Sequence, residues 1–92
     1  MPSLSHTLAA TALQRTAIGS IAMQAENDPA LFEELVSLAG DEDDTVAWHA
    51  AWALEQVSRR RPELLERYRK EISRRAVTEP RHGVQRLLLS IV

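Results

Sequence analysis

The segment Asp41–Val57, DEDDTVAWHAAWALEQV, predicts the central helix of the chain, and the other predicted helices stack beside it. Its leading acidic residues suit a helix start, because an aspartate accepts hydrogen bonds from the free amides of the first turn and opposes the positive end of the helix dipole. We therefore predict a helix over residues 44–58, with Asp43 or Asp44 as its N-cap. At about 100° per residue, one narrow face carries small and branched apolar side chains, namely Val46, Ala50, Ala53, Leu54 and Val57.

Two tryptophans of the same predicted helix lie off that apolar face. Trp48 and Trp52 are i,i+4 neighbours that can touch each other, and Glu55 falls on the same, roughly opposite side. Either another helix of the chain buries the two indoles, or they form a surface for a ligand, a partner or a second copy of the chain. The residues predicted to form such a partner-binding surface are Trp48, Trp52, Glu55 and Gln56.

Helix start and stop signals divide the rest of the chain. Asp28 precedes Pro29 as a cap precedes a first helical residue, and Gly40 follows where a left-handed C-terminal cap belongs. Pro62 opens a further helix after three arginines that favour a helix C-terminus. The prediction is one all-α domain over residues 1–92 with about five helices, at residues 7–25, 28–39, 44–58, 62–77 and 81–92.

Two segments of the chain repeat. Pro29-Ala-Leu-Phe-Glu and Pro62-Glu-Leu-Leu-Glu begin 33 residues apart, and each opens a helix that a second helix follows. The second helices align at a spacing of 38 residues, with Val46, Ala50 and Leu54 matching Val84, Leu88 and Val92. A period of this length built from helix pairs indicates a short α-solenoid of antiparallel pairs, which binds partners along a groove lined by one set of helices.

The residues Leu38-Ala-Gly-Asp-Glu-Asp-Asp-Thr-Val46, followed by Ala50, Ala51, Ala53 and Leu54, resemble the HEAT-repeat family. The resemblance covers one full unit, residues 28–57, and partial units on both sides. The family often has an arginine directly after the valine, and here that position is Ala47. The resemblance implies an α-solenoid scaffold that usually binds proteins and sometimes nucleic acid, and it implies no catalytic residues.

Charge is divided unevenly along the chain. Residues 1–55 carry a net charge of −8 and residues 56–92 carry +6, which together give the overall −2. Arg67, Lys70 and Arg74 form a basic stripe on the predicted helix 62–77, and further bases are Arg59, Arg60, Arg61, Arg75, Arg81 and Arg86. Such a stripe suits nucleic-acid phosphates, although the acidic overall balance opposes that use and the helix's own Glu63, Glu66 and Glu71 can pair with the bases.

The predicted last helix has an apolar stripe formed by Val84, Leu87, Leu88 and Ile91, with no polar helix after it. Terminal repeats of a solenoid need a polar outer face. We therefore expect either a longer family pattern or a second copy of the chain that packs against this stripe as a homodimer.

Composition and motifs argue against several other classes of protein. The chain has no cysteine, which excludes disulfides and thiolate metal sites. No apolar run approaches the roughly 20 residues of a membrane span, and no membrane partner is expected. Residues 7–25 lack the basic start and continuous apolar centre of a signal peptide, so a cytoplasmic location is expected.

No residue pattern predicts catalysis, a metal or a cofactor. His6, His49 and His82 are isolated, and the glycines form no phosphate loop. HEAT-like DNA glycosylases carry aromatic and acidic groups on their inner helices, to which Trp48, Trp52 and Glu55 are similar, but 92 residues are too few to form the enclosing groove. The resulting prediction is a non-catalytic scaffold that binds a protein partner through the helix at residues 44–58, with nucleic-acid binding and a glycosylase fragment as alternatives.

Overall fold

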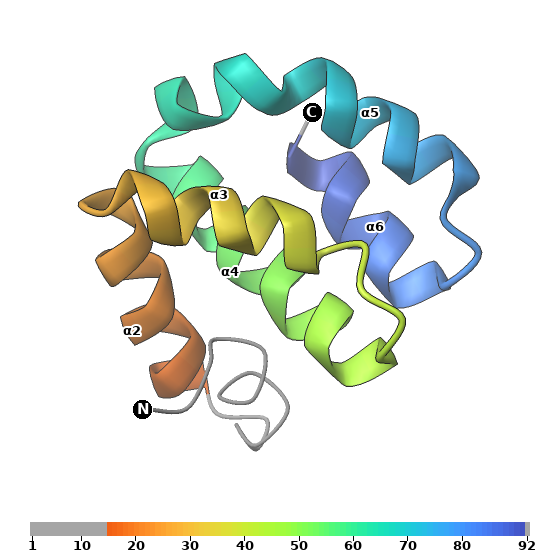
Figure 1. Cartoon of the computed structure of the whole chain (residues 1–92), viewed down its shortest axis with the longest axis horizontal. Helices are drawn as coiled ribbons and strands as arrows, with labels where there is room; N and C mark the ends of the chain where they lie inside the picture. Colours follow the sequence, from red (N-terminus) through yellow and green to blue (C-terminus); the bar gives the residue numbers. More distant parts are fainter. Residues whose placement is uncertain (1–14, 92) are drawn as a thin grey trace.

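The computed structural model describes residues 15–91, and these residues form helices joined by short turns, with no strand among them (Figure 1). The elements are α2 (Arg15–Glu26), α3 (Pro29–Leu38), α4 (Asp44–Arg60), the 3₁₀ helix η1 (Pro62–Tyr68), α5 (Arg69–Thr78) and α6 (His82–Ile91). The predicted all-α class is therefore confirmed. Residues 7–14 of the first predicted helix lie outside the described part, as does Val92. None of the helices from α2 to α6 is long and apolar enough to cross a membrane.

The central helix of the fold is α4, which packs against α2, α3, η1 and α6 (Figure 1). The predicted apolar face of α4 is confirmed, since all five of its side chains are buried. Ala47, His49, Ala51 and Glu55 are buried as well. The alanines let neighbouring helices approach α4 from several directions, so most of its circumference is covered rather than one face.

The helices are arranged as successive pairs. The pair α3–α4 is followed by the pair formed by η1–α5 and α6, and α4 lies in contact with both α2 and α6. The repeat positions Val46, Ala50 and Leu54 of α4 are buried, as are their counterparts Val84 and Leu88 of α6. The two second helices thus use equivalent positions for one continuous core, as the predicted α-solenoid requires.

Both predicted aspartate caps are present. The Asp28 Oδ1 accepts hydrogen bonds from the backbone amides of Ala30 (3.1 Å) and Leu31 (3.2 Å), and Pro29 stands at the start of α3. The Asp43 Oδ1 accepts from the amides of Thr45 (2.9 Å) and Val46 (3.1 Å). These bonds satisfy amides that have no partner inside the helix, and they fix where α3 and α4 begin.

The predicted single helix over residues 62–77 is wrong in its first half, which is the 3₁₀ helix η1. The residue before Pro62 is Arg61, whose side chain has no acceptor and makes no capping bond. Instead, the first turn forms a backbone hydrogen bond between residues three positions apart, in which the Leu64 amide donates to the Arg61 carbonyl (3.0 Å). This spacing is that of a 3₁₀ helix. An aspartate cap in front of the proline, as in α3, is the feature that this second unit lacks.

The predicted left-handed conformation of Gly40 is also wrong, because no glycine of the described residues has a positive φ. The chain leaves α3 through two further short turns, in which the Gly40 amide bonds to the Ser37 carbonyl (3.1 Å) and the Asp41 amide to the Leu38 carbonyl (3.0 Å). Gly40 lies beside α5. A Cβ at this position would be 3.5 Å from the Arg75 Nη1.

The apolar stripe of α6 is filled within the chain. Val84, Leu88 and Ile91 are 3%, 1% and 7% exposed, because α6 packs against both α4 and α5. Leu87 is half-buried against the same core. The expectation that this whole stripe is exposed for a second copy of the chain is therefore wrong. The periodicity of the α6 sequence alone does not show that α4 and α5 cover the stripe.

Candidate partner-binding surface

Trp48 and Trp52 form a stacked pair on the surface of α4. Their ring centroids lie 6.2 Å apart with 20° between the ring planes, so the predicted contact between these neighbours is present. Trp52 is half-buried against the core, whereas Trp48 is 38% exposed. The two predicted alternatives are thus divided between the two residues: the chain covers most of Trp52 and leaves part of the Trp48 indole in solvent.

His49 supports the tryptophan pair from the core side. Its side chain is 1% exposed, and its ring centroid lies 5.4 Å from that of Trp48. Among the described residues, no group of three or more histidine, aspartate or glutamate side chains is placed to hold a metal ion. His49 is thus a buried neighbour of the exposed indole.

The other two residues of the predicted surface are less accessible than the sequence indicated. Glu55 is 7% exposed, and its Oε1 accepts a hydrogen bond from the Arg59 Nε one turn later. Gln56 is half-buried. Glu55 lies off the apolar face, as predicted, but it is too buried for a contact residue, because α4 has neighbours on more sides than its apolar stripe suggests. Trp48 remains the exposed residue of this set.

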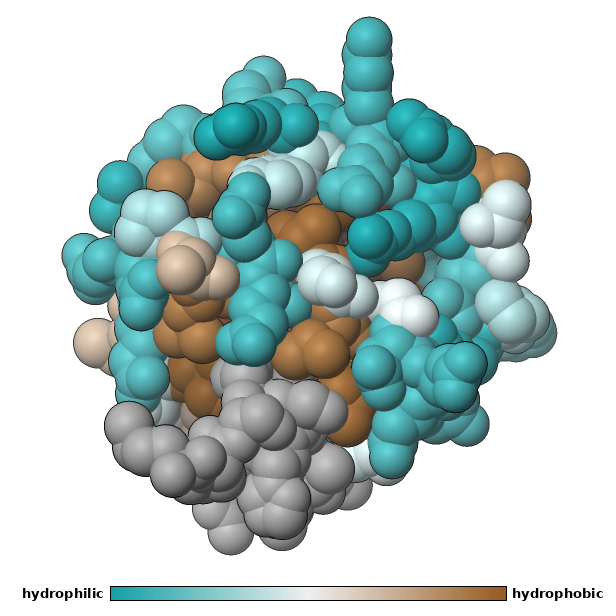
Figure 2. Space-filling model, viewed as in Figure 1, coloured by the Kyte–Doolittle hydropathy of each residue, from teal (hydrophilic) through white to brown (hydrophobic). Residues whose placement is uncertain are grey.

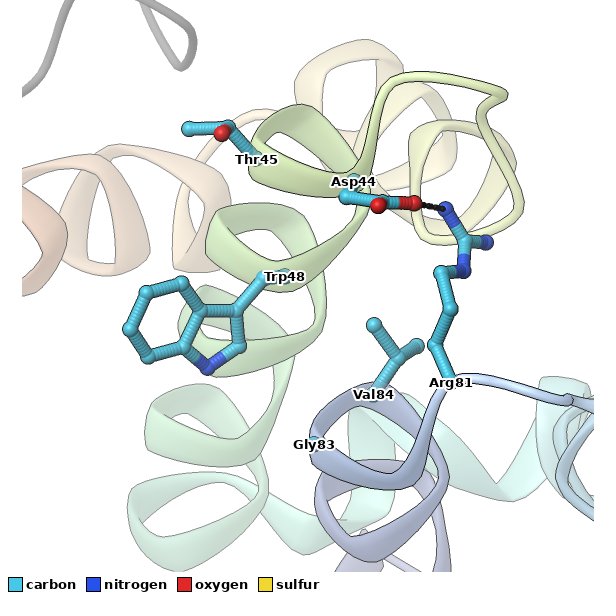
Figure 3. Close-up of a pocket in the computed structure, with 6 residues that line it drawn as sticks. All are labelled: Asp44, Thr45, Trp48, Arg81, Gly83 and Val84. Atoms are coloured by element: carbon cyan, nitrogen blue, oxygen red, sulfur yellow. Dashed lines mark hydrogen bonds and ion pairs between the residues drawn. The ribbon is translucent and has the colours of Figure 1, made fainter.

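A hollow of about 230 Å³ lies beside Trp48, between the first turns of α4 and α6 (Figure 3). Its lining consists of Asp44, Thr45, Trp48, Arg81, Gly83 and Val84. Gly83 adds no side chain, and no atom of the described residues lies within 4 Å of the place where its Cβ would be. The hollow is therefore open on the α6 side, and its apolar lining comes from Val84 and the Trp48 indole.

Arg81 closes one end of this hollow. Its Nη1 donates to the Asp41 carbonyl (2.8 Å) and to the Asp44 Oδ1 (3.2 Å), and its Nε donates to the Glu79 Oε1 (2.6 Å). The hydrogen bond from Arg81 lowers the pKa of Glu79, and the carboxylates raise the pKa of Arg81 in turn. From the sequence, Arg81 is only one base of a basic run. No local pattern links it to Asp41 and Asp44, which stand 40 and 37 positions earlier in the chain.

A second hollow continues from the first on the far side of Arg81. Its lining shares Asp44 and Arg81 with the first hollow, and the other residues are Gly40, Asp41, Glu42, Glu79 and Pro80. Glu42 is exposed, and the described residues give its side chain no hydrogen bond or ion pair. The surface thus passes from an apolar part at Trp48 to an acidic part at the turn before α4.

The predicted basic stripe lies on the exposed side of η1 and α5. Arg67 belongs to η1, Lys70 and Arg74 belong to α5, and all three are exposed. The acids of the same segment are engaged by other arginines: Glu63 by Arg61, Glu66 by Arg69 and Glu71 by Arg75. Within residues 15–91, the three stripe residues take part in no ion pair, whereas Arg61 and Arg75 of the same basic run are paired with acids, as the sequence predicted.

Few large apolar side chains are exposed in the described part of the molecule. In the view of Figure 2, polar side chains surround an apolar area at the centre of the face. The exposed large hydrophobic residues are Met23, Trp48, Val77 and Leu89, which are 58%, 38%, 77% and 51% exposed. Trp48 is the aromatic member of this set, and it is the one that borders a hollow.

Comparison with known families agrees with this architecture. A family model described as a HEAT repeat domain matches residues 4–92. The chain belongs to the HEAT-repeat family. No curated protein and no solved structure matches it. HEAT repeats generally mediate protein interactions and are typically non-catalytic, and in this HEAT-repeat chain α4 and α6 are the second helices of consecutive pairs.

Proposed function

We propose that this HEAT-repeat domain is a protein-interaction module that holds a partner segment against α4 and α6 around Trp48. The observation that carries the proposal is the position of Trp48, a partly exposed indole that stacks on Trp52 and borders the hollow between the two helices. Aromatic side chains held in this way are common anchors of protein interfaces, because they supply a large contact area at a small entropic cost.

The neighbouring contacts support a rigid anchor. His49 lies beneath the Trp48 ring, and Trp52 packs against its side, so the indole needs little reordering when a partner binds. Gln56 is positioned one turn beyond Trp52 on α4 and is partly accessible as a polar contact. Glu55 acts in this proposal by pairing with Arg59 and not by touching the partner.

The test is capture of protein partners from a native lysate with the wild-type chain and a Trp48→Ser variant. The matched control is Met23→Ser, which removes an apolar side chain that is 58% exposed on α2, away from the hollow. A partner kept by the wild type and by Met23→Ser, and lost by a Trp48→Ser variant with unchanged helicity and urea midpoint, supports the proposal. Equal capture by all three chains contradicts it.

A second candidate function is nucleic-acid binding by the stripe of Arg67, Lys70 and Arg74. The favouring observation is that these exposed bases keep their charge available, since the acids beside them pair with other arginines. Binding through phosphates weakens steeply as salt rises, with a slope of about one per contact in logarithmic terms. An Arg67→Gln/Lys70→Gln/Arg74→Gln variant that binds a DNA duplex as well as the wild type at low salt would exclude this candidate.

A further inference from the structure

We infer that the partner segment recognised at Trp48 is basic, with an apolar side chain flanked by lysine or arginine. This inference rests on the proposed function and names the chemistry of the partner. It comes from the second hollow, whose acidic lining plays no part in the contact proposed at Trp48. The occupant is thus one extended peptide segment lying across the starts of α4 and α6.

The two hollows adjoin each other at Arg81 and Asp44, and together they form the surface path that the segment would follow. Asp44 and Arg81 line both of them, so a segment that fills the first hollow has its flanking residues over the second. Trp48 and Val84 offer apolar contact at one end, and Gly83 leaves room for the segment's backbone. At the other end the lining includes the charged side chains of Asp41, Glu42 and Glu79, so a wholly apolar segment leaves these charges without a partner.

The charge of the path is strongly negative. Four carboxylates line it, from Asp41, Glu42, Asp44 and Glu79, against one guanidinium. That guanidinium belongs to Arg81, which is already engaged by Glu79 and Asp44 and offers little charge to an incoming anion. The Asp44 side chain is 83% exposed and Glu42 is exposed, so both are accessible to a cation. A cationic segment is attracted here, whereas an acidic one and nucleic-acid phosphates are repelled.

The exposed indole adds to the same preference. A lysine or arginine can lie over the accessible face of Trp48, where the negative face of the ring attracts a cation. In Figure 3 the Trp48 side chain projects from α4 away from Arg81, and the indole lines the first hollow together with Gly83 and Val84. A segment with alternating apolar and basic residues thus finds a favourable contact at each step along the path.

Fluorescence of the two tryptophans, which are the only ones in the sequence, measures the binding directly. The probes are a short synthetic peptide of alternating leucine and lysine and the same peptide with glutamate at every lysine position. The lysine peptide is expected to bind at least about tenfold more tightly than the glutamate peptide, and raising the salt concentration is expected to reduce that difference.

Charge variants of Glu42 locate the basic contact. Glu42→Gln is expected to weaken binding of the lysine peptide about two- to fivefold, because an exposed ion pair contributes modestly. Glu42→Lys is expected to weaken it more, because the reversed charge repels the peptide. The control is Glu34→Gln, an exposed acid on α3 that lines neither hollow, and it should leave binding unchanged. Within residues 15–91 the exposed Glu42 side chain makes no hydrogen bond or ion pair, so folding of these variants is expected to be preserved.

Three results would overturn the inference: equal binding of the two peptides, equal effects of Glu42→Gln and Glu34→Gln, or a second copy of the chain as the occupant, seen as a mass that doubles with concentration and is lost in Trp48→Ser. The proposed function fails separately, when Trp48→Ser keeps its captured partner. If Trp48→Ser loses the partner while Glu42→Lys keeps it, the interaction module stands and its basic specificity does not.

Discussion

The Arg81 Nη1 lies 3.2 Å from the Asp44 Oδ1, although the two residues are 37 positions apart. This contact ties the start of α6 to the start of α4 and forms the wall that the two hollows share. The HEAT-repeat family often has an arginine after the valine of the acidic turn, and this chain has Ala47 there. In this structure Arg81, from the next helix pair, reaches the acidic turn.

Replacing Arg81 by alanine is expected to destabilise the fold by about 1–3 kcal/mol, because it leaves a largely buried Glu79 carboxylate and the Asp41 carbonyl without their donor. Little of this loss should come from Asp44, whose side chain is 83% exposed, since exposed ion pairs contribute at most about 1 kcal/mol. Urea unfolding measures the change. Arg86→Ala, which removes an exposed arginine of α6, is the control, and an equal loss in both variants would contradict the assignment.

The stability that Glu79 supplies should depend on pH. Arg81 lowers its pKa in the folded chain, so this contribution is complete above the ordinary glutamate pKa of about 4.3 and is lost as the pH falls through the lower folded value. The difference in free energy of unfolding between wild type and Glu79→Gln is therefore expected to shrink from about pH 7 to about pH 3. A difference that stays constant over this range would show that the charge of Glu79 is not used.

Gly19→Ala is expected to stabilise the chain by about 0.5–1 kcal/mol, since a glycine inside a helix loses more backbone freedom on folding than an alanine does. The new methyl group meets no atom of the described residues within 4 Å, so the gain is not offset by crowding. A higher thermal midpoint with unchanged helicity is the expected observation. A lower midpoint would mean that this side of α2 is covered.

Ala50→Leu should destabilise the chain by about 1–3 kcal/mol, because the added methylenes enter a packed region where Ala50 is 0% exposed. Ala30→Leu makes the same change at an exposed position of α3 and serves as the matched control. Equal urea midpoints for the two variants would contradict the close packing around α4.

The sequence predicted the helices well where a local signal exists. Asp28 and Asp43 cap the helices that follow them because a capping bond joins residues two or three positions apart. The core face of α4 followed from the spacing of apolar residues, since that spacing reports one face of one helix.

The misses at the candidate surface share a physical cause, because each depends on residues distant in sequence. Glu55 is buried although its helical position pointed away from the apolar stripe, because α4 is enclosed by four other elements. Arg81 reaches Asp41 across 40 residues, and no local pattern indicates such a bond. The candidate surface was therefore predictable at Trp48 and Trp52, while its acidic continuation required the three-dimensional arrangement of α4 and α6.

The position of α4 has a consequence for cooperativity. Solenoids whose units contact only their neighbours can open unit by unit. Here α4 takes part in the contacts with α2, α3, η1 and α6, so loss of α4 removes packing from each of these four elements. Folding of these elements and formation of the two hollows are therefore coupled through α4. A partner bound between α4 and α6 raises the free energy of unfolding of these elements together, including α2, which lines neither of the two hollows.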